Sequence, residues 1–241
     1  MLGVKFDTSV LDRKFTRLEK EQLPFAMALT LTWTARDMQT AIKREISETF
    51  DRPTRYTIEG VFLRAATKRK LEAFVFLRNE ATKGTPPSKF LVPSVYGGHR
   101  RAKRFERALR ARGIIGPTEL TVPSVVAKKD RFGNVPASEI VKMLSSLGAN
   151  PDPLLNTPLG KHRRRGKKKV PWFVGTIGDA KNRAIFKTVG KSIEPVFFIV
   201  DESKVNYKKQ FRFFEVGDEA FTRTFRKNWK AALAYAVKTA R

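Results

Sequence analysis

The sequence contains no cysteine and only two histidines, His99 and His162. A chain without cysteine has neither a disulfide framework nor a thiolate metal site. Both histidines lie in strongly basic stretches, where neighbouring cations disfavour the protonated imidazole and no carboxylate is placed to orient the ring. We therefore expect neither histidine to act as a catalytic base or a metal ligand, and the sequence predicts no cofactor.

Long apolar stretches are also missing. The most apolar run, Val196 to Val200, is much shorter than the ~20 residues that cross a bilayer as a helix. The first residues, MLGVKFDTSV, do not combine a basic segment with an apolar run, so we expect no signal peptide. The sequence predicts a soluble protein that is made in the cytoplasm and has no membrane partner.

Acidic residues are scarce compared with basic ones. The chain has 49 Lys and Arg against 23 Asp and Glu, which gives a net charge of +26. Half of this excess lies in two short stretches, Arg100 to Arg112 and Lys161 to Lys169. Because a field of one sign attracts polyanions and repels copies of the same chain, the sequence indicates binding to nucleic acid or to an acidic protein surface.

These two stretches supply the candidate contact residues. The first contains one acid, Glu106, and the second contains none. A solvated surface normally mixes both signs, so these stretches differ from an ordinary charged face. The candidates for contact with nucleic acid or with an acidic partner are Arg100, Arg101, Lys103, Arg104, Lys161, Arg163, Arg164, Arg165, Lys167, Lys168 and Lys169.

Apolar residues are plentiful enough for a packed core. They make up 41% of the chain, which includes 19 phenylalanines, and disordered chains are poor in aromatics. In the first half, helical spacing predicts a short helix over 9–22 and a longer one over 24–50, or a single helix kinked at Pro24. Further on we expect a hairpin of strands 61–65 and 71–77, a loop over 78–98 and a basic helix over 99–112.

The second half is predicted to be mainly strands, closed by a helix. We expect short strands at 119–122 and 124–127, a helix over 137–147, a loop over 148–170, and strands at 171–177, 183–189, 195–200 and 208–215. The final helix, 218–239, carries an apolar residue at every fourth position, which predicts one buried face. That face comprises Phe221, Phe225, Trp229, Leu233 and Val237. The sequence thus predicts a single α+β domain over 1–241, with helices packed on a mainly antiparallel sheet and a basic loop over about 148–170.

One set of residues resembles a nuclease site. Glu202 and Lys204 end a predicted strand, and Asp179 lies upstream. An acid ahead of a Glu-x-Lys strand holds the metal in one large nuclease class, because hard cations prefer carboxylate oxygens. Turn chemistry at the end of a strand explains the same residues, so we expect no catalysis, and a metal-dependent nuclease stays as the less favoured alternative.

Several long segments resemble the minor tail protein Z family of tailed phages, also called tail completion proteins. The similarity covers nearly the whole chain and is weakest over 148–170. The segments that carry it are FDRPTRYT, KGTPPSKFLVPSVYGG, VPSVVAKKDRFGNVPASEIVKMLSSL and PVFFIVDESKVNYKKQFRFFEV.

The resemblance implies a structural virion protein of the phage neck or tail. Such a protein completes the head-proximal end of the tail and joins it to the DNA-filled head. The implied partners are copies of itself in a hexameric ring, a tail terminator or tail tube protein, a head-closure or neck protein, and the end of the packaged double-stranded DNA. The charge alone fits a second class equally well, a ribosomal-type or other basic nucleic-acid-binding protein. Binders of that class usually display aromatics for base stacking, and this is the feature that separates the two.

Overall fold

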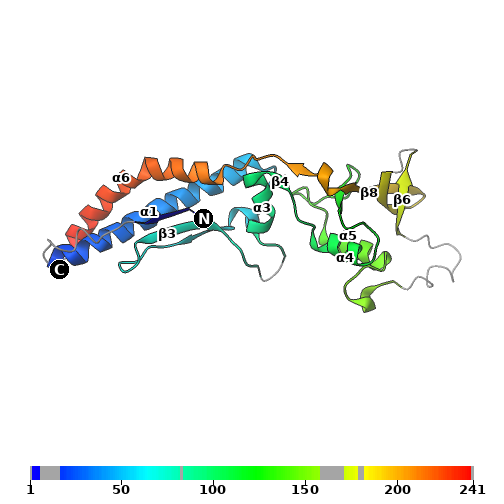
Figure 1. The fold of residues 1–241 in the computed structure, drawn as a ribbon, viewed down its shortest axis with the longest axis horizontal. Helices are drawn as coiled ribbons and strands as arrows, with labels where there is room; N and C mark the ends of the chain where they lie inside the picture. The colour runs from blue at the N-terminus through cyan, green and yellow to red at the C-terminus, as the bar shows by residue number, and fades with distance from the viewer. Residues whose placement is uncertain (1, 6–16, 82–83, 158–170, 179–181, 240–241) are drawn as a thin grey trace. The chain divides into compact units, whose positions relative to one another are not determined.

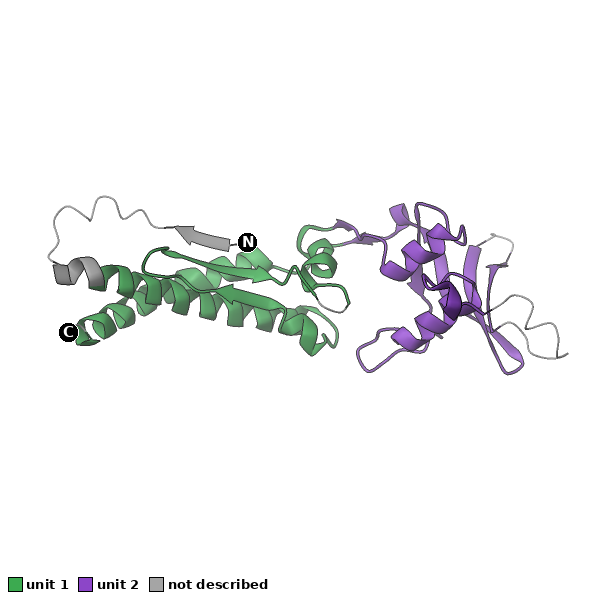
Figure 2. Cartoon of the chain, turned by 90° about the horizontal axis from the view of Figure 1, so that it is seen from below, with its two compact units in different colours: residues 1–97, 208–241 green, residues 98–207 purple. Residues whose placement is uncertain are grey.

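The computed structural model describes residues 2–5, 17–81, 84–157, 171–178 and 182–239, with side chains from Gln22 onward. The chain divides into two compact units, coloured separately in Figure 2. Unit 1 comprises Met1–Gly97 and Lys208–Arg241, and unit 2 comprises Gly98–Tyr207. The predicted α+β class is confirmed. We expected one domain, whereas unit 2 is inserted into the chain of unit 1.

Unit 1 consists of two long helices and a three-stranded antiparallel sheet with strand order β1-β3-β2 (Figure 1). The predicted hairpin is present, with Val61 opposite Leu77. The elements of unit 1 are β1 (Leu2–Lys5), α1 (Arg17–Thr49), α2 (Arg55–Ile58), β2 (Val61–Arg64), β3 (Glu72–Leu77), α3 (Pro87–Tyr96) and α6 (Phe213–Thr239).

Unit 2 contains a four-stranded antiparallel sheet with strand order β5-β8-β7-β6 and a separate two-stranded ladder of β4 with β9. Its helices and 3-10 turns are α4 (Arg104–Ala111), α5 (Ala137–Ser146), η1 (Pro153–Leu155) and η2 (Glu202–Lys204). Its strands are β4 (Gly98–His99), β5 (Glu119–Pro123), β6 (Trp172–Ile177), β7 (Asn182–Val189), β8 (Ser192–Asp201) and β9 (Asn206–Tyr207).

The antiparallel pair of α1 and α6 forms the main packing interface of unit 1 (Figure 1). Buried positions recur every four residues on both helices, which is typical of packing in which the i, i+4 ridges of two helices interdigitate. On α1 these positions are Ala26, Thr30, Thr34, Met38, Ile42 and Ile46, and on α6 they are Val216, Ala220, Ala232 and Ala236. Because most of the α6 positions are alanines, the helices can approach closely, and α1 then contacts the sheet through β2 and β3.

A polar contact near the middle of this pair fixes how the two helices align. The side-chain amide of Asn228 donates to the carboxylate of Asp37 at 2.8 Å and to Thr34 Oγ1 at 3.2 Å. Buried polar groups need such partners, and a slide along either helix would leave them unpaired. Asn228 therefore favours a single alignment of α6 on α1.

The core of unit 2 lies between helices α4 and α5 and one face of the four-stranded sheet. Its largest fully buried side chains include Trp172, Phe197, Leu109 and Met143. Phe197 lies directly opposite Ile185 on the neighbouring strand, and both belong to this core. The sheet face toward the helices is thus apolar.

The proline-containing segments differ from the prediction. Residues 17–49 form one helix that includes Pro24, so the single-helix alternative describes this segment, and residues 6–16 lie outside the described ones. The predicted loop 78–98 contains helix α3, because Pro87 suits a first helical turn and Leu91 and Val95 are buried in the unit 1 core. Pro87 also packs so closely on Gly60 that a Cβ there would lie 2.4 Å from its ring.

The predicted basic helix and the strand after 123 need correction. Residues 99–103 are not helical, and α4 starts only at Arg104 because His99 pairs in a ladder with Asn206. Residues 124–127 turn back instead of forming a strand, with the backbone amide of Ala127 donating to the carbonyl oxygen of Ser124. The helix predicted over 137–147 and the strands predicted over 171–200 are confirmed.

The end of the chain differs most. The strand predicted at 208–215 is absent, since α6 already begins at Phe213. Phe221 and Phe225 are partly buried against the unit 1 core, but Leu233 is 38% and Val237 67% exposed. The alanines Ala232 and Ala236 are buried instead. A close helix contact selects small residues, so the spacing of large apolar residues does not predict this buried face.

We predict that Ala232→Leu destabilises unit 1, whereas Leu233→Ala has little effect. Ala232 is 0% exposed against α1, so added methylenes overpack the contact and cost about 1–3 kcal/mol. Leu233 is the next residue along the chain and is exposed. Substitutions at exposed positions usually change the free energy of unfolding by less than about 0.5 kcal/mol. Chemical denaturation of both variants measures this, and a larger loss in Leu233→Ala would contradict the described face.

Candidate polyanion-binding surface

Only one of the two predicted basic stretches lies among the residues that the structure describes. The second stretch lies outside the described residues. It comprises Lys161, Arg163, Arg164, Arg165, Lys167, Lys168 and Lys169. The first lies in unit 2, where it covers the segment before α4 and the helix itself. The candidate surface is therefore built from Arg100 to Arg112.

Arg100 is not a contact residue of this surface. Its guanidinium forms a bidentate salt bridge with the carboxylate of Glu106, with N–O distances of 2.7 and 2.6 Å. It also donates to the carbonyl oxygen of Thr121 at 3.1 Å. The Arg100 side chain is only 11% exposed and that of Glu106 is fully buried. Arg100 thus serves to neutralise an internal acid, which corrects the expectation that it faces a polyanion.

Glu106 is held by three hydrogen-bond donors besides the guanidinium of Arg100. In addition to the guanidinium, its carboxylate accepts from the backbone amides of Lys103 at 2.6 Å and Thr121 at 2.9 Å, and from Thr121 Oγ1 at 2.8 Å. Burial alone raises the pKa of Glu106, but these bonds outweigh it and lower the pKa to about 2. The carboxylate stays ionised and ties together the start of α4, strand β5 and the segment before the helix.

Apart from Arg110, the remaining cations of this stretch are exposed to solvent. Helix α4 buries Phe105 and Leu109 on one side, which leaves its arginines on the other. Within the described part of the chain, the exposed cations of this stretch form no ion pair. These exposed cations, which we call the α4 surface, are Arg101, Lys103, Arg104, Arg107 and Arg112. Five cations without acids create a positive surface potential that favours a polyanionic partner.

Arg110 belongs to the structure and not to this surface. It donates to the carbonyl oxygen of Glu119 at 2.9 Å and lies 3.8 Å from Glu202. Glu119 in turn pairs with Arg183 at 2.8 Å, and Arg183 also donates to the carbonyl oxygen of Ile114. No local sequence pattern predicts this network, because its members lie far apart along the chain and meet only when β5, β7 and α4 come together.

The nuclease-like residues that the structure describes take part in local structural contacts. Asp201 accepts from the backbone amide of Ser203 and from Thr118 Oγ1, so it caps the turn η2. Glu202 pairs with Arg110, and Asp179 lies outside the described residues. Among the described residues, no group of three or more His, Cys, Asp or Glu side chains is placed to hold a metal ion. His99 Nδ1 lies 3.2 Å from the carbonyl oxygen of Val205, and His162 falls outside the described chain.

Aromatics on the outer face of the unit 1 sheet are covered by arginines. Phe62 and Phe76 are cross-strand neighbours in edge-to-face contact. Arg78 lies 4.6 Å from the ring centre of Phe62, and Arg64 lies 4.2 Å from that of Phe74. Guanidinium groups thus occupy the ring faces, in cation–π geometry, where bases would stack in a single-strand binder.

Over the described residues, no helix combines the length and the apolar character that crossing a bilayer requires.

The comparisons with known proteins return no match. No protein-family model, no curated protein and no solved structure is significantly similar to this chain.

The depressed pKa of Glu106 predicts how unit 2 responds to acid. A carboxylate whose pKa is lower in the folded state stabilises the fold above its unfolded pKa, and that contribution is lost as the pH falls through the folded value. The pKa of an unperturbed glutamate is 4.5 and that of Glu106 about 2. We therefore expect unit 2 to lose stability between about pH 4.5 and 2, as measured by thermal melting across this range.

Two variants assign that loss to Glu106. Glu106→Gln removes the charge beside the buried Arg100, so it costs about 3–5 kcal/mol at neutral pH and flattens the acid dependence. The control is Glu202→Gln, which removes a half-exposed carboxylate from the same unit and changes stability by less than about 1 kcal/mol. An unaltered acid dependence in Glu106→Gln would contradict the described pair.

Proposed function

We propose that this chain is a structural protein of a tailed-phage virion, which completes the head-proximal end of the tail and joins it to the DNA-filled head. The observation that carries the proposal is the set of sequence segments that resemble the minor tail protein Z family. The segment KGTPPSKFLVPSVYGG includes α3 and ends with Gly97 and Gly98, where the chain passes from unit 1 into unit 2. The segment PVFFIVDESKVNYKKQFRFFEV includes the return from unit 2 at Tyr207 to Lys208.

The charge distribution supports a position beside packaged DNA. The α4 surface presents five exposed cations, and Glu106 and Arg100 hold the backbone that carries them. Copies of a chain with a charge of +26 repel one another in a ring unless anions neutralise them. DNA phosphates or an acidic face of a neighbouring neck protein would supply these anions.

The sheet of unit 2 offers a surface for assembly. Val122 and Phe198 are direct cross-strand neighbours on the face opposite to the core residues Phe197 and Ile199. They are 38% and 36% exposed. Apolar side chains grouped on a strand pair support contact with another protein. We assign this face to a neighbouring copy in a hexameric ring, with the tail terminator or tail tube protein and the head-closure protein as the axial partners.

A basic nucleic-acid-binding protein outside any virion is the second candidate. The unpaired cations of the α4 surface favour it. The covered rings of Phe62 and Phe74 speak against a binder that stacks single-stranded bases.

Loss of the gene product separates these two functions. For a tail completion protein, we expect particles from the mutant lysate to comprise filled heads and near-complete tails that fail to join, because each part assembles before the joining step. Electron microscopy of the lysate measures this, with the wild-type gene supplied in trans as the control. Normal joined virions would contradict the proposal, and truncated or absent tails would assign the chain to tube assembly instead.

A further inference from the structure

A second group of unpaired cations lies on α6, far along the chain from the two basic stretches. From Ala220 to the final residue, the sequence contains no Asp or Glu. The cations of the middle of the helix are Arg223, Arg226, Lys227 and Lys230, which we call the α6 stripe. All four are exposed, and within the described residues none of them takes part in an ion pair.

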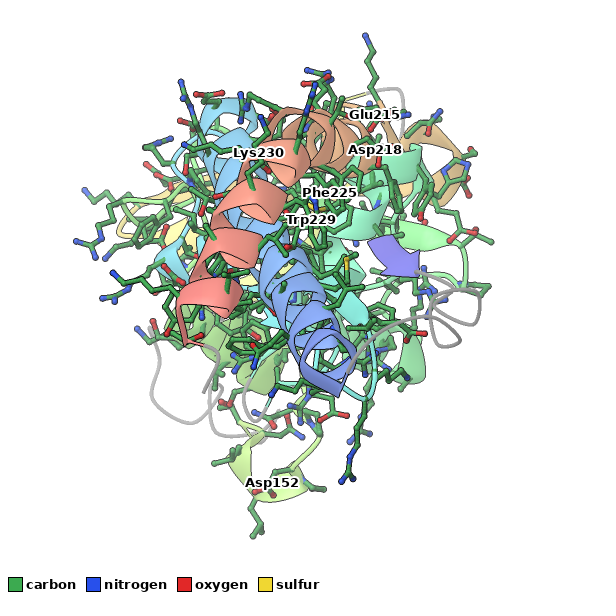
Figure 3. The ribbon with its side chains drawn as sticks, turned by 90° about the vertical axis from the view of Figure 1, so that its left-hand side faces the viewer. Asp152, Glu215, Asp218, Phe225, Trp229 and Lys230 are labelled. Carbon is green, nitrogen blue, oxygen red and sulfur yellow. The ribbon has the colours of Figure 1, made fainter. Side chains whose placement is uncertain are left out.

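Helix geometry places the stripe on one side of α6. Positions i, i+3, i+4 and i+7 share a face, and Arg223 to Lys230 follow this spacing. Phe225 is packed against the unit 1 core, and Trp229 is partly buried. Figure 3 shows Lys230 on a different side of the helix from Phe225 and Trp229. The cations are thus aligned on the solvent side and are not scattered around the helix.

Ordinary structural roles do not account for the stripe. Cations are favoured in the last turn of a helix by the macrodipole, but the stripe ends more than two turns before Thr239. The acids of the first α6 turns pair with other cations, Glu215 with Lys209 at 2.7 Å and Glu219 with Arg212 at 2.5 Å. Four adjacent like charges repel one another, so the stripe lowers the stability of the free helix.

The stripe matches the phosphate backbone of a duplex. It extends about 10 Å along the helix, at 1.5 Å per residue. Phosphates of one strand of B-DNA recur about every 3.4 Å along the axis, so about three of them lie within that length. The large aromatics of this part of α6, Phe225 and Trp229, face away from the stripe, so base stacking on it is not available. Between Arg223 and Lys230 no large apolar side chain is exposed, so the stripe itself has none to insert into a lipid surface.

From these observations we propose that the α6 stripe binds the phosphate backbone of double-stranded DNA and forms a second contact surface on unit 1, besides the α4 surface on unit 2. The proposal rests on charge and helix geometry and does not depend on a role in a virion. An acidic protein surface is the competing occupant, and the test distinguishes the two.

Two variants of equal charge provide the test. The stripe variant carries R223Q, R226Q, K227Q and K230Q, since glutamine keeps helix propensity. The control variant carries R44Q, R52Q, K70Q and K209Q, which removes four exposed cations from the same unit, each paired with a nearby acid. Circular dichroism and thermal melting establish that both full-length variants fold. Binding to a mixed-sequence duplex DNA is then measured over a range of salt concentrations.

If the stripe contacts phosphates, its variant loses counterion release at about three sites. The slope of log K against log salt then falls by about 3, at about 0.9 per contact. The control variant keeps a slope near that of the wild type, and binding to duplex exceeds binding to a single strand of equal length. Equal slopes in the two variants would overturn the proposal and assign the stripe to an acidic protein. Tighter binding of the single strand would overturn the choice of a duplex.

Discussion

The excess of positive charge is the constraint on which the rest of this structure depends. With 49 cations and 23 acids, most cations have no acid available to them. The fold places a few acids where they hold it together. Glu106 pairs with Arg100 inside unit 2, and Glu139 joins α5 to β7 through Lys187 at 2.5 Å. Lys187 lowers the pKa of Glu139, as its partners do for Glu106. The remaining cations are left to the surface, where they repel one another unless a polyanion binds.

That distribution links the fold to the proposed function. The α4 surface depends on Glu106, which fixes the start of α4 to β5, and the α6 stripe depends on the close contact of α6 with α1. In both cases one side of a helix is buried by small or apolar residues, and the opposite side displays cations. Each unit thus carries a basic surface on a helix that packs on the core of that unit. Phosphates suit either surface by itself, because counterion release requires no fixed side-chain geometry.

The sequence predicted the regular parts of the fold and missed those decided by tertiary contacts. Alternation and turn residues were sufficient for the hairpin of β2 and β3 and for strands β6 to β8, because each pairs with a neighbour in sequence. The prolines of α3 predict a break in regular structure, whereas burial of Leu91 and Val95 stabilises a helix there. Of the candidate site, Arg101, Lys103 and Arg104 are exposed as expected. The role of Arg100 depends on Thr121 as well as on Glu106, and no local pattern contains that contact.

Lysine footprinting tests the central claim, that the unpaired cations face a polyanion, most directly. The full-length protein is labelled with an amine-reactive reagent with and without duplex DNA, and mass spectrometry measures the reactivity of each lysine. The account predicts that Lys103, Lys227 and Lys230 are protected by DNA, whereas the ion-paired Lys70 and Lys209 react equally in both states. Protection of all these lysines to the same degree, or of none, would contradict it.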